Sequence, residues 1–378
     1  MTGRRHHYIP QFLQRGFNSR MGRATPRAWF YRKGAAAPIE TTLRNIGVES
    51  SFYRYKALGV DTSADEAITR AEGQRLAPLV QRLRVENPMR GQDPVAVAEL
   101  FSHIYARTKA VWEIGKMQAP RMFERLSAFA RNQTAIRDVL PRLIETQPQI
   151  FARLLAPRYP GRDIEEFLSD SMKQMHGVPA KDLDSDIGPM LDGLRTLALR
   201  LLQVSKVQCL RELSETPDVA KRFQGCSFSV LELAGAKLVQ GDTPVVFYKE
   251  SGFTPVLAKD EPFEYAFLPI TPTRVVVAIV TGGRPESWEA LRDASIACSY
   301  EHFIAAARYP ELEVRSVTIG SGFPSATDAD IDRLFAEAVE LACTPSWMGP
   351  EAVAAIEHLV KQYLSTPQGA GATVSGGK

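Results

Sequence analysis

The sequence has few cysteines and no long apolar run. Its four cysteines, spread over 378 residues, are Cys209, Cys226, Cys298 and Cys343, and no two of them have Cys-x-x-Cys spacing. A zinc knuckle or a disulfide framework needs paired or regularly spaced cysteines, so neither is expected. A membrane-spanning helix needs about twenty consecutive apolar residues, and a secretory signal needs an apolar segment near the N-terminus. Their absence predicts a cytoplasmic protein that does not contact a membrane.

Several common nucleotide-binding and catalytic motifs are also missing. The chain contains no GxxxxGK[ST] phosphate-binding loop, no GxGxxG dinucleotide motif and no GxSxG nucleophile elbow. Each of these motifs supplies backbone amides or a nucleophile that the corresponding reaction requires. The sequence therefore gives no support for an ATPase, a dinucleotide enzyme, a common serine hydrolase or a zinc finger.

Acidic residues are absent from the first part of the chain, although the formal net charge of the whole is only +3. Residues 1–39 hold eight basic residues: Arg4, Arg5, Arg15, Arg20, Arg23, Arg27, Arg32 and Lys33. A segment with one sign of charge creates a local positive field that attracts phosphate. This segment is consistent with nucleic-acid binding, and equally with a solvated basic arm.

Helical patterns dominate the first part of the chain. The sequence predicts short strands at 28–32 and 51–55, and a helix from a Ser63–Glu66 capping box to about Arg84. Asp93 followed by Pro94 predicts the start of a helix that continues to Ile114. Further helical pieces are expected over 118–180, and apolar residues at three-four spacing predict a helix from Asp186 to about 204.

The pattern changes near residue 225. Five β-branched or aromatic runs separated by turn residues, at 228–233, 237–239, 245–248, 265–268 and 273–280, predict one mostly antiparallel sheet over residues 225–282. Helices are expected at 287–308, from 327 and at 350–364. The predicted fold is α+β and predominantly helical. Its expected parts are an N-terminal motif segment (1–60), a helical region (61–222), an α+β region (223–365) and a disordered tail (366–378).

The run His6-His7-Tyr8-Ile9-Pro10-Gln11-Phe12-Leu13, with Arg15 and Phe17, resembles the opening motif of the bacterial domain-of-unknown-function family 4238. Three further segments are similar to segments of that family: Asn45–Tyr53, the acidic helix with Glu66 and Glu72, and the turn Gln240–Val245. The Leu268–Pro272 run is similar to a strand entry of the same family. At the position of the family's Leu-Arg pair this chain has Gln14-Arg15. The resemblance covers most of residues 4–310. It implies which positions are candidate site residues, but it implies no activity.

His7 and Arg15 are the first candidate site residues. Adjacent histidines on an extended chain point in different directions, so one of His6 and His7 would face a given pocket. Histidine serves as a metal ligand or transfers protons near neutral pH, whereas a buried structural histidine is the alternative. The planar fork of Arg15 can hold a phosphate or carboxylate, or form an internal pair with Glu49 or Glu72.

Glu72 and Asp242 are the candidate carboxylates. Glu72 stands beside Gly73, which would let a ligand approach closely, and Asp242 lies in a Gly-Asp-Thr-Pro turn between two predicted strands. Solvated helix surface and turn formation are the respective alternatives. One histidine with two carboxylates suits Mg²⁺ or Mn²⁺, so His7, Glu72 and Asp242 are predicted as metal ligands and catalytic groups.

His103 and Arg107 are the remaining candidates, for substrate binding. With Glu99 they recur every four residues and would share one helix face. This is not the His-Glu-x-x-His zinc pattern, which needs two histidines. An exposed polar ladder is the alternative. The resemblance adds that Arg107-Thr108 stands where the family tends to have Arg-Thr.

Two functions follow as hypotheses. The first is a metal-dependent nuclease or phosphodiesterase, acting in bacterial defence against phage, in which His7, Glu72 and Asp242 converge and Arg15, His103 and Arg107 hold substrate. The second is a non-catalytic module that binds nucleic acid or a protein partner through the basic segment. The first requires the named side chains to meet in one cleft.

Overall fold

The computed structural model describes the following residues: 5–20, 22, 25–57, 60–85, 93–131, 142, 206–207, 209–211, 214, 222–257, 261–280, 283, 285, 287–324, 327–329, 331–333 and 335–336. The helices expected from Asp186 to about 204 and at 350–364 and the expected disordered tail (366–378) therefore lie outside the described residues. Of the helical pieces expected over 118–180, only 118–131 and 142 are described. Helices and antiparallel sheets occur together, so the fold is α+β.

The chain forms two compact units. Unit 1 comprises Met1–Arg54, Ser63–Ile114 and Lys206–Ser325, and unit 2 comprises Tyr55–Thr62, Gly115–Ser205 and Ala326–Lys378. In unit 2, Arg121 forms an ion pair with Asp328 and Arg125 with Asp332. The two units therefore do not follow the predicted borders at 60 and 222, because each unit combines segments that are distant in sequence.

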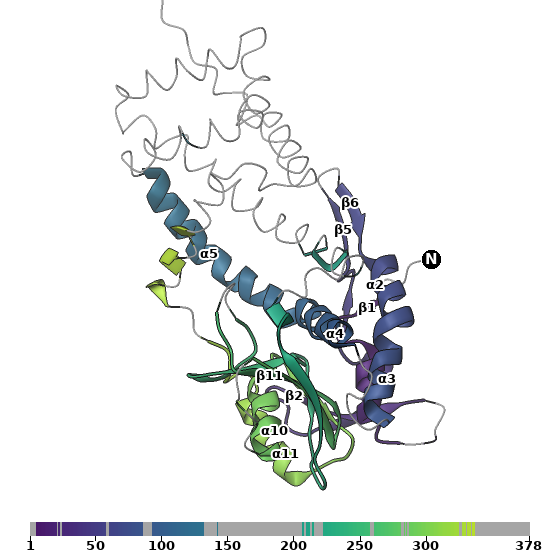
Figure 1. The fold of residues 1–378 in the computed structure, drawn as a ribbon. Coiled ribbons are helices and arrows are strands. Elements are labelled where there is room, and N and C mark those ends of the chain that lie inside the picture. Colours follow the sequence, from purple (N-terminus) through teal and green to yellow (C-terminus); the bar gives the residue numbers. More distant parts are fainter. Residues whose placement is uncertain are drawn as a thin grey trace, which may run out of the picture. The chain divides into compact units, whose positions relative to one another are not determined.

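The described strands are β1 (Arg5–His7), β2 (Arg27–Arg32), β3 (Ile39–Thr42), β4 (Val48–Ser50), β5 (Arg54–Ala57), β6 (Val60–Ser63), β7 (Ser227–Glu232), β8 (Gln240–Gly241), β9 (Val246–Lys249), β10 (Gly252–Thr254), β11 (Tyr265–Thr271), β12 (Arg274–Ile279) and β13 (His302–Ala305). The described helices are α1 (Gln11–Gln14), η1 (Arg15–Phe17), η2 (Leu43–Asn45), α2 (Asp65–Ala71), η3 (Glu72–Leu76), α3 (Ala77–Val85), α4 (Pro94–Arg107), α5 (Lys109–Arg131), α10 (Trp288–Ala297), α11 (Pro310–Arg315) and η7 (Ser316–Thr318). Figure 1 shows most of them along the chain.

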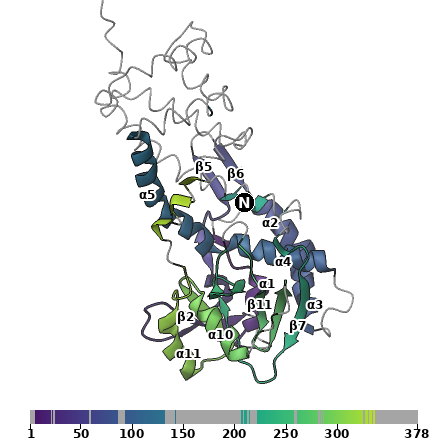
Figure 2. The ribbon, with the colours of Figure 1, turned by 60° about the vertical axis from the view of Figure 1, so that its left-hand side comes forward.

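A five-stranded antiparallel sheet, in the order β10-β9-β11-β12-β7, lies within the predicted range 225–282. Residues of α3 and α4 pack in one core cluster with Phe247, Leu268 and Val276 of this sheet. Residues of α10 pack in another cluster with Phe267 and Val277 of the same strands. Both faces are therefore buried, which explains why β11 and β12 are continuous apolar runs without alternation. Figure 1 and Figure 2 show α4 and α10 on opposite sides of β11.

A second sheet was not predicted. It has four strands in the order β3-β2-β13-β8, and joins the N-terminal strand at 27–32 to strands from the C-terminal half. The expectation of one sheet is therefore wrong at two points: 237–239 is not a strand, and Gln240–Gly241 pairs with β13 instead. The helix expected over 287–308 ends at Ala297, because His302–Ala305 forms the β13 strand between β2 and β8.

The local signals for helix ends were confirmed in part. Asp93 caps α4 by accepting a hydrogen bond from the Val95 amide, as predicted. The helix stops at Arg107 instead of continuing to Ile114, since Thr108 has an extended conformation before α5 begins. Ser63 accepts a hydrogen bond from the Asp65 amide, but α2 begins after Ala64 without a side-chain cap, so the predicted capping box does not form.

Two further findings concern the described residues as a group. None of their helices is both long and apolar enough to cross a membrane. Among the described residues, Cys209, Cys226 and Cys298 form no disulfide, and Cys343 lies outside the described residues.

Candidate functional site

The two N-terminal histidines are placed by pairing of β1 with β4. His6 lies opposite Glu49 and His7 opposite Val48 in an antiparallel register. Because successive side chains of a strand point to opposite faces, His6 is buried whereas His7 is half-buried. The two rings therefore have different surroundings and different roles.

His6 is a structural residue with both ring nitrogens engaged. Its Nδ1 accepts the backbone N–H of Tyr53 at 2.9 Å, so the proton resides on Nε2, which lies 3.2 Å from a carboxylate oxygen of Asp65. The ring also stacks on Tyr53, with centroids 5.2 Å apart. His6 thereby joins β1 to the turn at Tyr53 and to the start of α2.

His7 presents a different arrangement. Its Nδ1 lies 3.2 Å from the carbonyl oxygen of Ile46, which can only accept, so Nδ1 carries the proton. The lone pair of Nε2 then accepts a hydrogen bond from the Gln11 side-chain amide at 2.7 Å. Burial lowers the pKa of His7, and the nearby cations Arg107, Arg5 and Arg44 lower it further. At neutral pH the ring is therefore uncharged and is a proton acceptor at Nε2.

Arg107, the last residue of α4, connects the elements around His7. Its Nη1 forms an ion pair with Glu72, its Nε donates to the Tyr53 hydroxyl at 2.7 Å, and its Nη2 donates to the His7 carbonyl at 2.5 Å. The Tyr53 hydroxyl in turn donates to the same carbonyl. Arg107 is 1% exposed, so this network compensates for removing its charge from water.

His103 lies one helical turn before Arg107. Its Nε2 accepts from Arg107 Nη1 at 3.2 Å, and burial lowers its pKa to about 3, so it is a neutral acceptor. Glu99, one turn earlier, accepts two hydrogen bonds from Arg75. The exposed ladder considered for this face is wrong, since all three residues are buried. Arg75, the partner of Glu99, and Glu72, a partner of Arg107, both come from η3, which packs on α4.

Glu72 owes its position to a local irregularity in the helix. Residues Glu72–Leu76 form a π-helical turn between α2 and α3. Such turns hold one extra residue and occur frequently at functional sites. Tyr53 is placed by a second irregularity, a turn in which Ser51 has a positive φ of 56°. This turn replaces the strand predicted over 51–55, because β5 begins only at Arg54.

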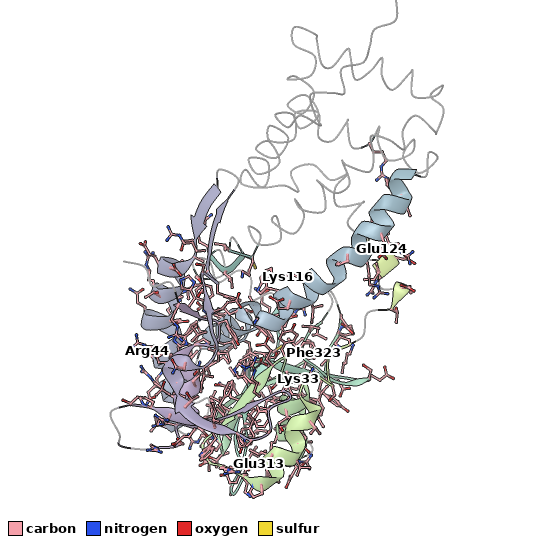
Figure 3. All side chains as sticks on the ribbon, turned by 180° about the vertical axis from the view of Figure 1, so that it is seen from behind. Lys33, Arg44, Lys116, Glu124, Glu313 and Phe323 are labelled. Atoms are coloured by element: carbon pink, nitrogen blue, oxygen red, sulfur yellow. The ribbon has the colours of Figure 1, made fainter. Side chains whose placement is uncertain are left out.

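His7, Glu72 and Arg107 line a pocket of about 570 Å³ within unit 1. Its walls are Arg5, His6, His7, Tyr53, Asp65, Glu66, Ile68, Thr69, Arg70, Glu72 and Arg107. Asp65 and Glu72 are paired with His6 and Arg107, whereas Arg5 and Arg70 are exposed. Exposed Arg44, close enough to His7 to affect its pKa, lies at the outer edge of the protein in Figure 3. The pocket therefore combines a neutral base with three exposed charged side chains, the cations Arg5 and Arg70 and the anion Glu66.

Asp242 does not line this pocket. It follows β8 and is 2% exposed, and its carboxylate accepts the backbone N–H groups of Tyr300, Glu301 and His302 at 2.6, 2.7 and 3.1 Å. Burial raises the pKa of Asp242 to about 7, against the opposing effect of the three amides. In the structure this carboxylate anchors the loop before β13.

Arg15 is exposed on η1 and does not line the pocket either. Within the described part of the chain, the carboxylates considered as its partners pair elsewhere: Glu49 with Lys109, and Glu72 with Arg107. Burial lowers the pKa of the half-buried Arg84 to about 10, and the positive charge of Arg15 lowers it further. Of the six predicted site residues, His7, Glu72 and Arg107 thus line one pocket and His103 supports it.

The ligand set predicted for Mg²⁺ or Mn²⁺ is not assembled. Among the described residues, no three histidine, cysteine, aspartate or glutamate side chains form a group that could hold a metal ion. Glu72 shares its carboxylate with Arg107, and Asp242 lies outside the pocket. His7, Glu72 and Asp242 therefore do not fit a shared metal site in this structure.

Three residues of the site were missed in the sequence. Tyr53, Asp65 and Gln11 contact Arg107, His6 and His7, respectively. Tyr53 stands in the Asn45–Tyr53 segment that resembles the family, which was a usable signal. Gln11 lies four residues after His7, a spacing that became informative only once the chain was seen to turn into α1.

Comparison with known proteins gives one family. A family model described as "Protein of unknown function (DUF4238)" matches residues 5–287. This range includes β1, the turn at Tyr53, η3 and α4, and hence every residue that lines the pocket. No curated protein and no solved structure gives a significant match.

Proposed function

The chain belongs to the DUF4238 family of proteins of unknown function, and from that premise we propose that its pocket at His7 binds and cleaves a phosphate diester of nucleic acid. The observation that carries the proposal is the state of His7. Its ring is neutral, its tautomer is fixed by the Ile46 carbonyl, and it lines a pocket with exposed arginines. A positioned imidazole with a lone pair is a suitable general base.

In the proposed reaction, His7 Nε2 takes a proton from an attacking water as the oxygen–phosphorus bond forms. The bond between phosphorus and the leaving oxygen breaks, and that oxygen takes a proton from solvent. The Gln11 amide occupies Nε2 in this structure, and its half-exposed side chain can rotate to contact the substrate instead. Arg5 and Arg70 stabilise the phosphate charge from the pocket wall.

Arg107 has a positioning role in this scheme. Its donors are directed to Glu72, the Tyr53 hydroxyl and the backbone carbonyl of His7. It therefore fixes the strand that carries the base, and its charge adds to the effect of burial in lowering the pKa of His7. The proposed reaction does not require Mg²⁺ or Mn²⁺, and activity is therefore measured with and without each ion.

The test is hydrolysis of a labelled oligonucleotide and of bis(p-nitrophenyl) phosphate in Mg²⁺, in Mn²⁺ and in EDTA. We expect His7→Ala to lower kcat by about 10²–10⁴-fold, the usual range for a lost general base. Arg15→Ala, an exposed residue outside the pocket, is the matched control and should retain wild-type activity. The acid limb of kcat/KM should have its midpoint below 6.5, since activity is lost as His7 protonates. Absence of turnover in all three conditions, or an unaffected His7→Ala variant, would refute the proposal.

A second candidate is non-catalytic binding of nucleic acid, which the exposed Arg5, Arg44 and Arg70 near the pocket favour. Fluorescence anisotropy with a labelled oligonucleotide separates the two. Binding by both wild type and His7→Ala, without turnover by either, would identify a binding module. A bacterial cytoplasmic role in phage defence is part of the first proposal, and phage plating on cells with wild type or His7→Ala tests it.

A further inference from the structure

Glu66, on the α2 wall of the pocket, is used neither by the proposed reaction nor by the helix cap. It stands in the first turn of α2, which begins without a side-chain cap, so its carboxylate has no capping role. Glu66 lines the pocket and is exposed. A carboxylate beside a bound phosphate is repelled by it unless another part of the ligand offers a donor to that carboxylate. The ligand that fits this wall therefore carries hydrogen-bond donors as well as phosphate.

The other two carboxylates of the pocket wall are engaged within the protein. Asp65 pairs with His6, and Glu72 pairs with Arg107. The Glu66 carboxylate forms no ion pair with any residue that the structure describes. Of the three wall carboxylates, Glu66 is thus the one whose two oxygens can accept hydrogen bonds from a ligand.

Thr69 lies beside Glu66 on the pocket side of α2. Residues three apart on a helix are neighbours, and both side chains are exposed and line the pocket. Ala67 and Ala71 are buried on the other side of the helix. The carboxylate only accepts hydrogen bonds, whereas the threonine hydroxyl can donate one. This face of α2 therefore matches a ligand edge on which two donors stand next to an acceptor.

Among the nucleic-acid bases, guanine has such an edge. Its N1–H and N2–H are adjacent donors that the two oxygens of one carboxylate accept in parallel, and its O6 acceptor stands next to them. Adenine and cytosine offer an amino group beside a ring-nitrogen lone pair, which a carboxylate repels. Uracil and thymine offer one N–H between two carbonyl oxygens. A carboxylate thus selects guanine from the other bases.

We propose that Glu66 binds the N1–H and N2–H of a guanine base, with the Thr69 hydroxyl donating to O6. This assignment rests on the proposed function, because it takes the ligand of the pocket to be nucleic acid. The pocket, of about 570 Å³, has the size of sites that hold one small molecule, which are about 300–1,000 Å³. In a duplex the same edge of guanine is paired with cytosine, so the ligand is a single strand or an unpaired base.

The experiment measures binding of the 5′-monophosphates of guanosine, adenosine, cytidine and uridine to the full chain by isothermal titration calorimetry. The four share phosphate and ribose, so the ratio of their Kd values reports the base alone. We expect the wild type to bind the guanosine nucleotide about tenfold more tightly than the others, the order of discrimination that a bidentate contact to a base provides.

Glu66→Gln keeps the size of the side chain but replaces one acceptor oxygen by a donor, and it should abolish this preference. Glu289→Gln, at an exposed position of α10 outside the pocket, removes the same charge and should keep the preference. Equal Kd values for the four nucleotides in the wild type, binding of none of them, or an unchanged preference in Glu66→Gln overturns the assignment.

The proposed reaction is judged separately, by the cleavage assay with His7→Ala. Cleavage by the wild type together with equal Kd values for the four nucleotides would leave the reaction intact and overturn the role of Glu66. A preference for the guanosine nucleotide that Glu66→Gln abolishes, without cleavage of any substrate, would support the role of Glu66 and refute the reaction.

Discussion

At the scale of single residues, Arg107 is the group on which the pocket depends. It is fully buried and donates to a carboxylate, a hydroxyl, a carbonyl and an imidazole that come from four places in the chain. Such a planar fork has no equivalent in lysine, whose ammonium is a single point of charge. The identity of the residue therefore matters as much as its charge.

Arg107→Lys should lower the free energy of unfolding by about 3 kcal/mol, because the buried hydrogen bonds to Tyr53 and to the His7 carbonyl are lost. Urea unfolding followed by circular dichroism measures this. Arg15→Lys, the exposed counterpart, should stay within about 0.5 kcal/mol of the wild type. A loss of less than 1 kcal/mol in Arg107→Lys would show that the network does not stabilise the fold.

The residues that form the site could be predicted from the sequence only in part. The resemblance and the four-residue spacing singled out His7, Glu72, His103 and Arg107, which the structure brings together. Asp242 also looked like a site residue, because a carboxylate at a strand end looks the same whether it faces a pocket or backbone amides. Convergence of side chains depends on tertiary packing, which no local pattern contains.

At the scale of elements, glycines show where helices and strands approach closely. A Cβ atom on Gly16, in η1, would lie 1.9 Å from the carbonyl oxygen of Ile270 and 2.7 Å from Arg84 Nη2. A Cβ atom on Gly73, in η3, would meet nothing within 4 Å. The first glycine is thus required by the contact of η1 with β11, and the second is not required by sterics.

Gly16→Ala should therefore destabilise the protein by about 2 kcal/mol, through overpacking against β11. Gly73→Ala should be neutral or stabilise it by up to about 1 kcal/mol, since alanine loses less backbone freedom in a helix. Thermal unfolding of the two variants in parallel makes the comparison. Equal effects of the two substitutions would contradict the close contact of η1 with β11.

Elements with strong local signals were predicted well. The strand at 27–32, the Asp93 cap and the sheet within 225–282 follow from aromatic, capping and β-branched residues. The strand His302–Ala305 was assigned to a helix, because its four residues are too few to show alternation next to an amphipathic helix. Its pairing with β2 and β8 is a long-range contact that outweighs local propensity.

At the scale of the whole molecule, three buried titratable groups set a pH dependence. Burial lowers the pKa of His103 to about 3 and that of His302 to about 4, and raises that of Asp242 to about 7. Between pH 4.5 and 6, the unfolded chain binds protons on both histidines and the folded protein binds one on Asp242. The difference is 2 − 1 = 1 proton, so stability increases with pH.

The free energy of unfolding should thus fall by about 1.4 kcal/mol for each unit of pH below 6, from these three groups. Urea unfolding at several pH values between 6 and 4.5 gives the slope. In His103→Leu the difference becomes 1 − 1 = 0 protons, and the slope should decrease by the same amount. An identical slope in that variant would mean that His103 is already protonated when folded.

Division of the chain into units could not be read from the sequence. Unit 1 takes three separate segments, the last of which begins at Lys206. Composition changes near 225 and suggested a border there, yet β2 and β13, about 270 residues apart in sequence, are neighbouring strands. Composition reports local structure, whereas the grouping of segments follows strand pairing.

The π-helical turn at Glu72–Leu76 has a consequence for how this chain tolerates length changes. A π turn is equivalent to a single-residue insertion in an α-helix, and an α-helix rotates by about 100° per residue. A one-codon deletion at Gly73 would convert α2, η3 and α3 into one regular helix. Every residue on one side of the deletion, including Glu72, would then be rotated by about that angle relative to α3. The number of residues in this helix, which sets the rotational position of each side chain, keeps Glu72 opposite Arg107.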